Sequence, residues 1–386
     1  MTIPASGCSM RALSVPSSNG QRLSMTDITQ TQVEAALKAV IDPHLDQDLV
    51  SAKCVKNIKT EGGHVTVDVV LGYPAKGFQD KLVAQLKDKV AALGAANVTI
   101  NVSSNIVSHG VQKGVKPIEG VKNIIAVASG KGGVGKSTVA VNLALALSAE
   151  GAKVGILDAD IYGPSQPRML GVKMKPESKD GRKMEPITSY HLQAMSIGFL
   201  VDEETPMIWR GPMVTQALEQ LLRETNWQDL DYLIIDLPPG TGDVQLTLAQ
   251  KVPVTGAVIV TTPQDIALLD ARKGLKMFEK VEIPVLGIVE NMSTHICSKC
   301  GHEEHIFGEG GGSRMAEDYD VDFLGGIPLD IRIREQTDGG KPTVVAEPDG
   351  RLSRIYREIA RRVAGKLSKQ KKDYSAKFPG IVIQQT

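Results

Sequence analysis

A glycine-rich segment, GKGGVGKST, spans residues 130–138 and directly follows the apolar, β-branched run NIIAVAS at 123–129. It matches the phosphate-binding loop pattern G-x-x-x-x-G-K-[S/T], whose glycines let successive backbone N–H groups converge on phosphate oxygens. The helix predicted to begin near Lys136 and to continue to Glu150 adds the positive end of its dipole. Because strand, loop and helix follow one another in the required order, the segment predicts a nucleoside triphosphate site rather than a plain turn.

Three residues of this loop carry its expected chemistry. Lys136 should reach the β and γ phosphates in a catalytic role, and the Ser137 hydroxyl should ligate Mg²⁺. A second lysine, Lys131, lies at the mouth of the loop, where it can point toward a nucleotide held by another copy of the chain. This second lysine predicts a dimer that closes over nucleotide. The residues predicted to bind the nucleotide are Gly130, Lys131, Gly132, Gly133, Val134, Gly135, Lys136, Ser137 and Thr138.

Composition and charge exclude several classes of protein. The 44 Lys and Arg residues balance the 44 Asp and Glu residues, so the chain has no net basic field that would attract nucleic acid. No apolar run approaches the length of a membrane span, so no stable membrane association is expected. Four cysteines in 386 residues are too few for a disulfide framework and predict free thiols in a reducing compartment, the cytoplasm.

A chain of this length, with 42% apolar residues, suits two domains with sizeable cores. Apolar helical patterns at 29–41 and 78–93, with strand patterns at 65–71 and 98–102, predict a small α+β domain. A Gly- and Lys-bearing stretch at 110–120 is typical of a linker. The predicted divisions are a disordered leader (1–25), the small α+β domain (26–105), a linker (106–120), a P-loop ATPase domain (121–370) and a C-terminal tail (371–386).

From residue 121 onward, short apolar strands alternate with helices. Because the strands are apolar on both faces, helices should cover both sides of the sheet. This pattern is typical of an α/β fold with a doubly wound, mostly parallel sheet, in which ligands collect beyond the carboxyl ends of the strands. Strands are predicted at 124–129, 154–158, 232–236, 257–261 and 285–290, with a short one near 322–324, and helices at 213–224, 266–280 and 352–367.

Polar residues follow three of these strands. Asp160, in LDADIYGPS at 157–165, is the candidate for positioning or activating the attacking water, because phosphoryl transfer depends on in-line orientation. Asp158 is expected to orient the metal shell or the lysine, although both aspartates could simply make turn hydrogen bonds. Asp236 precedes PPGTG and is expected to hold Mg²⁺, with the following segment changing conformation when the γ-phosphate leaves. The Asn291 amide offers a donor and an acceptor, which suits the edge of adenine.

Cys297 and Cys300 form a C-x-x-C pair, which can grip one soft metal centre from a single tight turn. One pair supplies half of a tetrahedral site. Four cysteines from two chains could hold an iron–sulfur cluster. Alternatively, His302 and His305 could complete a zinc site within one chain, or the pair could act as a redox dithiol.

Seven motifs together closely resemble the bacterial Mrp/ApbC iron–sulfur cluster carriers, which are deviant P-loop ATPases. The motifs are GKGGVGKST, LDADIYGPS, WRGPM, DYLIIDLPPGTGD, TTPQDIAL, VENMS and the C-x-x-C pair, and the resemblance covers residues 116–370. Residues 26–105 more weakly resemble the MIP18-like domain often fused ahead of the ATPase domain in these carriers. His44 departs from that pattern, because an acid is common at its position.

This resemblance implies an ATPase that forms a homodimer and uses ATP and Mg²⁺. It implies a labile [4Fe–4S] cluster, bridged between subunits by Cys297 and Cys300 and exchanged with cluster-assembly scaffolds and apo iron–sulfur proteins. By position, Lys131 and Lys136 match the family's two lysines, Asp160 its switch-one acid and Asp236 its Mg²⁺-side acid.

Two other functions would use the same loop. A positioning or partitioning ATPase would act on membrane or DNA, and the basic helix predicted at 352–367 is its only support in the sequence. A zinc-stabilised ATPase would bind one metal ion per subunit and would transfer nothing.

Overall fold

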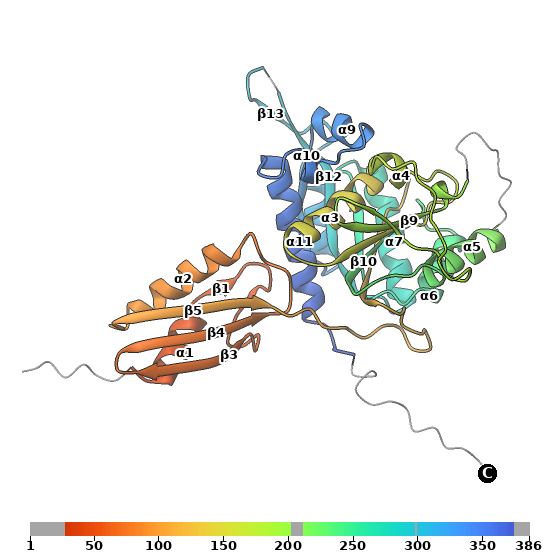
Figure 1. Cartoon of the computed structure of the whole chain (residues 1–386). Coiled ribbons are helices and arrows are strands. Elements are labelled where there is room, and N and C mark those ends of the chain that lie inside the picture. Colours follow the sequence, from red (N-terminus) through yellow and green to blue (C-terminus); the bar gives the residue numbers. More distant parts are fainter. Residues whose placement is uncertain (1–27, 202–210, 298, 374–386) are drawn as a thin grey trace, which may run out of the picture.

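The computed structural model describes residues 28–201, 211–297 and 299–373. The chain forms one sheet of three strands and a larger one of nine. Figure 1 shows the small sheet with its helices beside the larger body. The predicted leader, residues 209–210 of the WRGPM motif and the predicted tail from residue 374 onward lie outside the described residues.

The small part is an α+β unit in which helices pack on the sheet. Thr29 caps the first helix, because its hydroxyl accepts the backbone N–H of Gln32 while the Gln32 side chain accepts the N–H of Thr29. Buried side chains of the central strand, including Val65 and Val67, join Leu82 of the second helix in one core. β3 runs antiparallel to β4, and β5 runs parallel to it. The elements are α1 (Gln30–Lys38), β1 (Ile41–Asp42), β2 (Gln47–Asp48), β3 (Val55–Glu61), β4 (His64–Leu71), α2 (Gln79–Ala91) and β5 (Asn97–Ser104).

The large sheet runs in the order β13-β12-β11-β6-β10-β7-β9-β8, and β14 also pairs with β12. Among the described strands of this sheet, only the pairs β8–β9 and β12–β13 are antiparallel. The predicted fold class, a doubly wound and mostly parallel sheet preceded by a small α+β domain, is therefore confirmed. The strands are β6 (Val121–Ala128), β7 (Val154–Asp158), β8 (Ile187–Ser189), β9 (Leu192–Ser196), β10 (Leu230–Asp236), β11 (Gly256–Thr261), β12 (Val285–Ile296), β13 (Glu303–Glu304) and β14 (Phe323–Leu329).

Helices cover both faces of this sheet. Successive side chains of each strand point to opposite sides, and apolar side chains on both sides need a covering layer. Ile125 and Val127 of β6 share a buried cluster with α3 and α11, whereas Ile124 and Ala126 share one with α5 and α7. No helix in the described ranges is long and apolar enough to cross a bilayer. The helices are α3 (Lys136–Ala149), α4 (Gln166–Met169), the 3-10 helix η1 (Ile197–Phe199), α5 (Gly211–Arg223), α6 (Asp243–Lys251), α7 (Asp265–Lys280), α8 (Gly311–Asp318), α9 (Ile331–Asp338), α10 (Thr343–Ala346) and α11 (Arg351–Ser368).

The predicted strands leave out several strands of the structure, among them β3, β8 and the mostly buried β9. β3, which reads VKNIKTE, is an edge strand in which no residue is fully buried, so it lacks an apolar run. β12 continues six residues past its predicted end at 290, to Ile296, and the chain then turns back as β13. Residues 291–296 of this extension are mostly half-buried, so they lack the two-sided apolar pattern that predicts the first half of the strand.

Helix α3 is buried along most of its length and ends beside the small domain. Glu150, directly after the helix, has a fully buried carboxylate that accepts hydrogen bonds from Arg357 and Arg361 of α11, each 2.7 Å long. In the small domain, the N–H of Lys76 donates to the Glu150 carbonyl at 3.1 Å, and the N–H of Gly77 donates to the carboxylate at 2.8 Å. One acidic residue thus joins α3, α11 and the small domain.

His44, which replaces the common acid, lies at the same junction and is 1% exposed. Its Nδ1 lies 3.2 Å from the Tyr73 hydroxyl, and its Nε2 lies 3.1 Å from the Glu358 carboxylate of α11. Burial alone would lower the pKa of His44, but hydrogen bonds with Asp42 and Glu358 outweigh burial and raise it. A Cβ at Gly365 of α11 would lie 2.3 Å from the His44 carbonyl oxygen, so the small domain packs directly on this helix.

Replacing Glu150 with alanine should destabilise this junction, because two partly buried arginines would lose their carboxylate. We expect the free energy of unfolding to fall by about 3 to 5 kcal/mol, measured by urea denaturation. Glu119→Ala is the matched control, since Glu119 is 88% exposed in its ion pair with Lys183. The control should unfold at nearly the wild-type urea concentration, and equal midpoints for the two variants would contradict the assigned role of Glu150.

Candidate functional site

The loop at 130–138 joins β6 to α3, and its shape depends on glycines. Gly133 and Gly135 have φ angles of +82° and +80°, in the left-handed region that glycine adopts without strain. A Cβ at Gly135 would lie 2.2 Å from Nδ2 of Asn291, and a Cβ at Gly130 would lie 2.1 Å from the carbonyl carbon of Asp270. The loop is therefore packed tightly between β12 and α7.

Asn291 is buried and holds this loop from the side of β12. Its Nδ2 donates to the carbonyl oxygen of Val134 over 2.8 Å. The amide nitrogen therefore contacts the loop backbone, and the predicted contact of Asn291 with adenine stays a prediction.

Lys131 is half-buried, and its carbonyl oxygen accepts the Ser129 hydroxyl at 2.9 Å. Its side chain forms no ion pair with any residue that the structure describes. Its predicted role toward a second nucleotide stays a prediction.

Lys136 and Asp236 form a buried ion pair at the carboxyl edge of the sheet, with side chains 6% and 0% exposed. The Lys136 ammonium contacts Asp236 Oδ1 and lies 3.2 Å from the Ser137 hydroxyl oxygen. Gln166 Nε2 donates to Asp236 Oδ2 at 2.8 Å and to the Ser137 carbonyl at 3.2 Å. The fold thus brings the two predicted Mg²⁺ ligands together, with the predicted phosphate-binding lysine between them.

The carboxylate of Asp158 is fully buried and organises the turn after β7. It accepts the backbone N–H groups of Asp160, Ser165 and Gln166 at 3.1, 2.9 and 3.0 Å. These are the turn hydrogen bonds that the sequence left open as an alternative. Burial raises the pKa of Asp158, and the neighbouring charge of Asp236 raises it further.

Asp160 is half-buried at the same edge of the sheet. Burial raises its pKa, while the positive charge of Lys136 opposes that shift. The predicted role of Asp160 toward an attacking water stays a prediction.

The segment at 237–242, predicted to respond to the γ-phosphate, is tied to the base of the loop. The N–H of Gly240 donates to the carbonyl oxygen of Ser129 at 2.9 Å. The Gln245 side chain in turn donates to the carbonyl oxygen of Pro239 at 2.5 Å. One direct hydrogen bond therefore joins the base of the loop to this segment, and its response to the γ-phosphate stays a prediction.

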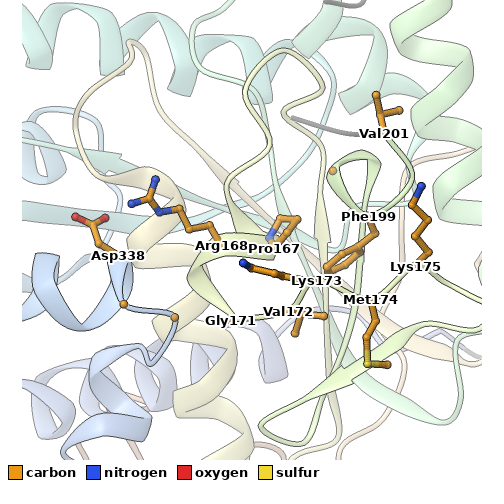
Figure 2. A pocket seen from close by; sticks show the side chains of 13 residues that line it. Pro167, Arg168, Gly171, Val172, Lys173, Met174, Lys175, Phe199, Val201 and Asp338 are labelled. Atoms are coloured by element: carbon orange, nitrogen blue, oxygen red, sulfur yellow. The ribbon is translucent and has the colours of Figure 1, made fainter. Parts of the chain in front are cut away.

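A cavity of about 590 Å³ is lined in part by residues of α4 (Figure 2). Pro167 and Arg168 of α4 line it together with Phe199, Asp338 and residues 171–175. None of the loop residues lines this cavity, so it is separate from the nucleotide site.

The donor set at the sheet edge fits Mg²⁺ and a triphosphate. Mg²⁺ prefers oxygen ligands, which the Ser137 hydroxyl and the Asp236 carboxylate supply. The loop supplies a cation, two left-handed glycines and the amino end of a 14-residue helix, which are the elements that hold phosphate.

Cys297 and Cys300 lie at the tip of the β12–β13 hairpin, which projects from the body of the molecule (Figure 1). The N–H of Cys297 donates to the His302 carbonyl and the N–H of Gly301 donates to the Cys297 carbonyl, both at 2.9 Å. Backbone N–H groups of Cys300 and Lys299 lower the pKa of the Cys297 thiol. Cys297 is half-buried and Cys300 is exposed, so both thiols can be reached from outside.

The two histidines proposed for a zinc site do not converge on the cysteines. His305 Nδ1 lies 3.3 Å from the Ser293 carbonyl, and His302 Nε2 lies 3.9 Å from the Glu304 carboxylate. Within the described ranges, no three His, Cys, Asp or Glu side chains are grouped closely enough to hold a metal ion.

A mostly parallel sheet, a glycine-rich loop leading into a helix and an aspartate ending the adjacent strand define a P-loop NTPase. Residues 120–364 match the model of the ParA family, described as NUBPL iron-transfer P-loop NTPase. The chain belongs to this family of iron-transfer P-loop NTPases. Residues 30–102 match a second family, described as iron–sulfur cluster assembly protein.

Relatives of known name agree with this assignment. The iron–sulfur cluster carrier protein of Escherichia coli K12 is 52% identical over 353 residues, which cover 89% of this chain and 96% of the relative. The mouse iron–sulfur cluster transfer protein NUBPL is 53% identical over 266 residues, which cover 68% and 83%. A solved nucleotide-binding protein from Archaeoglobus fulgidus, in complex with ADP, has a TM-score of 0.53 at 40% identity and covers 60% of this chain and 90% of its own. The resemblance to iron–sulfur carriers is confirmed, and neither alternative function is favoured.

Gln166 is a residue of this site that the sequence motifs do not single out. It directly follows the predicted LDADIYGPS motif and begins α4. Only the folded chain brings its amide onto Asp236, which is 70 residues away in the sequence.

Because Lys136 is paired with buried Asp236, its removal should affect both ATP hydrolysis and stability. Lys136→Ala should reduce ATP hydrolysis at least about a hundredfold, because a donor toward the phosphates is lost. It should also lower the free energy of unfolding by about 3 kcal/mol or more, because Asp236 would be buried without its partner.

Adding Asp236→Asn to Lys136→Ala removes the unpaired charge, so the double variant should recover most of the lost stability while hydrolysis stays absent. Urea denaturation and phosphate release measure the two effects separately. A double variant as unstable as Lys136→Ala would contradict the ion pair.

Proposed function

We propose that the chain is an ATP-dependent iron–sulfur cluster carrier, in which nucleotide binding and hydrolysis at the loop control a cluster held by Cys297 and Cys300. The observation that carries this proposal is the course of β12. Asn291 of this strand hydrogen-bonds the phosphate-binding loop, and the same strand ends one residue before Cys297. A single strand therefore joins the nucleotide site to the thiols.

At the nucleotide site, Ser137 and Asp236 are the residues that would hold Mg²⁺, which shields and orients the phosphate oxygens of ATP. Lys136 would exchange its contact with Asp236 for the phosphates. Asp160 would position water, and Lys131 would reach the nucleotide of a partner subunit. Asp158 holds the turn that carries Asp160, so it keeps this carboxylate at the sheet edge.

The cargo is a [4Fe–4S] cluster, which four thiolates hold. One chain presents two thiols on its hairpin, so a homodimer supplies the set. Exposure of the hairpin tip suits exchange with other proteins, which would be cluster-assembly scaffolds on one side and apo iron–sulfur proteins on the other. Thiols kept free for this exchange suit a reducing compartment such as the cytoplasm.

The path along β12 contains a kink. Met292 has a φ of +56°, and the pairing of β12 with β14 shifts register between Asn291 and His295. Cys297 lies six positions after Asn291, a span of about 20 Å in extended chain. A change in the loop can therefore turn the hairpin relative to the sheet at this kink.

Cysteine substitution tests the cargo site. Wild-type protein reconstituted without oxygen should carry about four iron and four sulfide per dimer, with the brown absorbance of a [4Fe–4S] cluster. Cys297→Ala and Cys300→Ala should each lose the iron, the sulfide and the colour while remaining folded, because the thiols lie outside the core. Cys54→Ala is the control, since Cys54 is buried and distant from the hairpin. Full iron content in the double alanine variant would rule out this site.

Asn291→Ala tests the path between the two sites. Loss of its hydrogen bond to Val134 should leave iron content unchanged but reduce the effect of ATP on transfer to an apo [4Fe–4S] protein at least threefold. Ser293→Ala is the matched control, because Ser293 lies two residues along the same strand and donates to Ile327 instead. Transfer is followed by the absorbance of the acceptor, and equal ATP effects in both variants would contradict coupling through β12.

A further inference from the structure

Gln166 connects the three segments that build the nucleotide site. It is 1% exposed and stands at the first position of α4. Its backbone N–H donates to Asp158 at the end of β7, and its Nε2 donates to Asp236 at the end of β10 and to the Ser137 carbonyl at the start of α3. Its side chain therefore lies between the two residues assigned to Mg²⁺.

The two oxygens of the buried Asp236 carboxylate have different partners. Oδ1 of Asp236 faces the Lys136 ammonium, while Oδ2 accepts the Gln166 amide at 2.8 Å. When Lys136 turns to phosphate, Gln166 remains as a fixed donor to Asp236. A buried carboxylate needs such a donor, because an unpaired one is costly to keep charged. The same bond fixes the rotation of the carboxylate, and so the direction in which Oδ1 points.

The amide oxygen of Gln166, Oε1, gives a second, separate observation, because it is buried without a hydrogen-bond partner among the described residues. None of those residues forms a hydrogen bond with the adjacent Ser165 hydroxyl either. The assignment of nitrogen and oxygen is settled by the neighbours, because a flipped amide would set its oxygen against the Asp236 carboxylate and the Ser137 carbonyl. An acceptor without a donor beside the two Mg²⁺-side residues fits a ligand that brings its own O–H groups, such as a hydrated cation.

We propose that Gln166 is a positioning residue for Mg²⁺ in the proposed ATPase reaction. Its amide nitrogen holds the Asp236 carboxylate in the orientation that the hydrated cation requires, and its amide oxygen accepts a hydrogen bond from a water molecule of that cation. Gln166 contacts neither phosphate nor attacking water in this role. The proposal rests on the proposed function only in its assignment of Ser137 and Asp236 to Mg²⁺.

Gln166→Met tests this role, since methionine keeps the length of the side chain and removes both hydrogen-bonding groups. Binding of a fluorescent ATP analogue is titrated with Mg²⁺ and, separately, measured in EDTA. We expect the Mg²⁺ concentration for half-maximal binding to rise at least tenfold, with affinity in EDTA within twofold of wild type. In hydrolysis assays, kcat at fixed Mg²⁺ should fall at least tenfold while KM for ATP changes less than threefold.

The control is Gln336→Met on α9. Gln336 also donates to a carboxylate, that of Glu347 at 2.7 Å, and its Oε1 is likewise buried without a donor within the described residues. Gln336→Met and Gln166→Met should each lower the melting temperature slightly. Gln336→Met should keep the wild-type Mg²⁺ dependence of ATP binding. Should Gln166→Met fail to fold, Gln166→Ala carries the same test, because it also removes the donor to Asp236 and its smaller side chain leaves room for water.

Unchanged Mg²⁺ dependence in the Gln166 variants, with only a lower melting temperature, would overturn the proposal and leave Gln166 a structural residue. A parallel loss of affinity in EDTA would overturn it as well, since the effect would then lie on the phosphates. Failure of the proposed function is recognised separately, by wild-type protein that binds no cluster or hydrolyses no ATP.

Discussion

The nucleotide site depends on one buried lysine meeting one buried aspartate at the edge of the central sheet. Lys136 follows β6 and Asp236 ends β10, and parallel register sets Asp236 beside Val127 and Asp158 on the two neighbouring strands. Within the described part of the chain, each of these two charges forms its ion pair with the other, so the pair requires loop, helix and strand to keep this register. In the proposed function, Lys136 would exchange its contact with Asp236 for the phosphates, so one anion would replace another.

Much of this arrangement could be predicted from the sequence, since the residues concerned lie at ends of strongly apolar strands. The loop, Asp158, Asp160 and Asp236 are all adjacent to β6, β7 and β10, and parallel strands bring their carboxyl ends to one edge. Gln166 could not be found this way. Its role comes from a side-chain contact across 70 residues, which no local pattern encodes.

The β12–β13 hairpin and the junction between the two domains also could not be predicted in full from the sequence. The sequence predicts that the C-x-x-C pair binds metal but not that β12 extends to carry it, because the extension is half-exposed and polar. His44 stands out in the sequence only as a departure from the common acid. In the folded chain it lies between Tyr73 and Glu358, so it belongs to the contact between the small domain and α11. Tertiary packing decides such positions, whereas local propensity does not.

Helix α3 has a mechanical consequence that follows from its surroundings. It begins with Lys136 in the phosphate-binding loop, spans 14 residues or about 21 Å, and ends at Glu150, which the two arginines of α11 and the small domain hold. Close-packed neighbours along most of its length resist bending, so the two ends of the helix keep a fixed separation. The phosphate-binding loop and the seat of the small domain are therefore the opposite ends of one stiff segment.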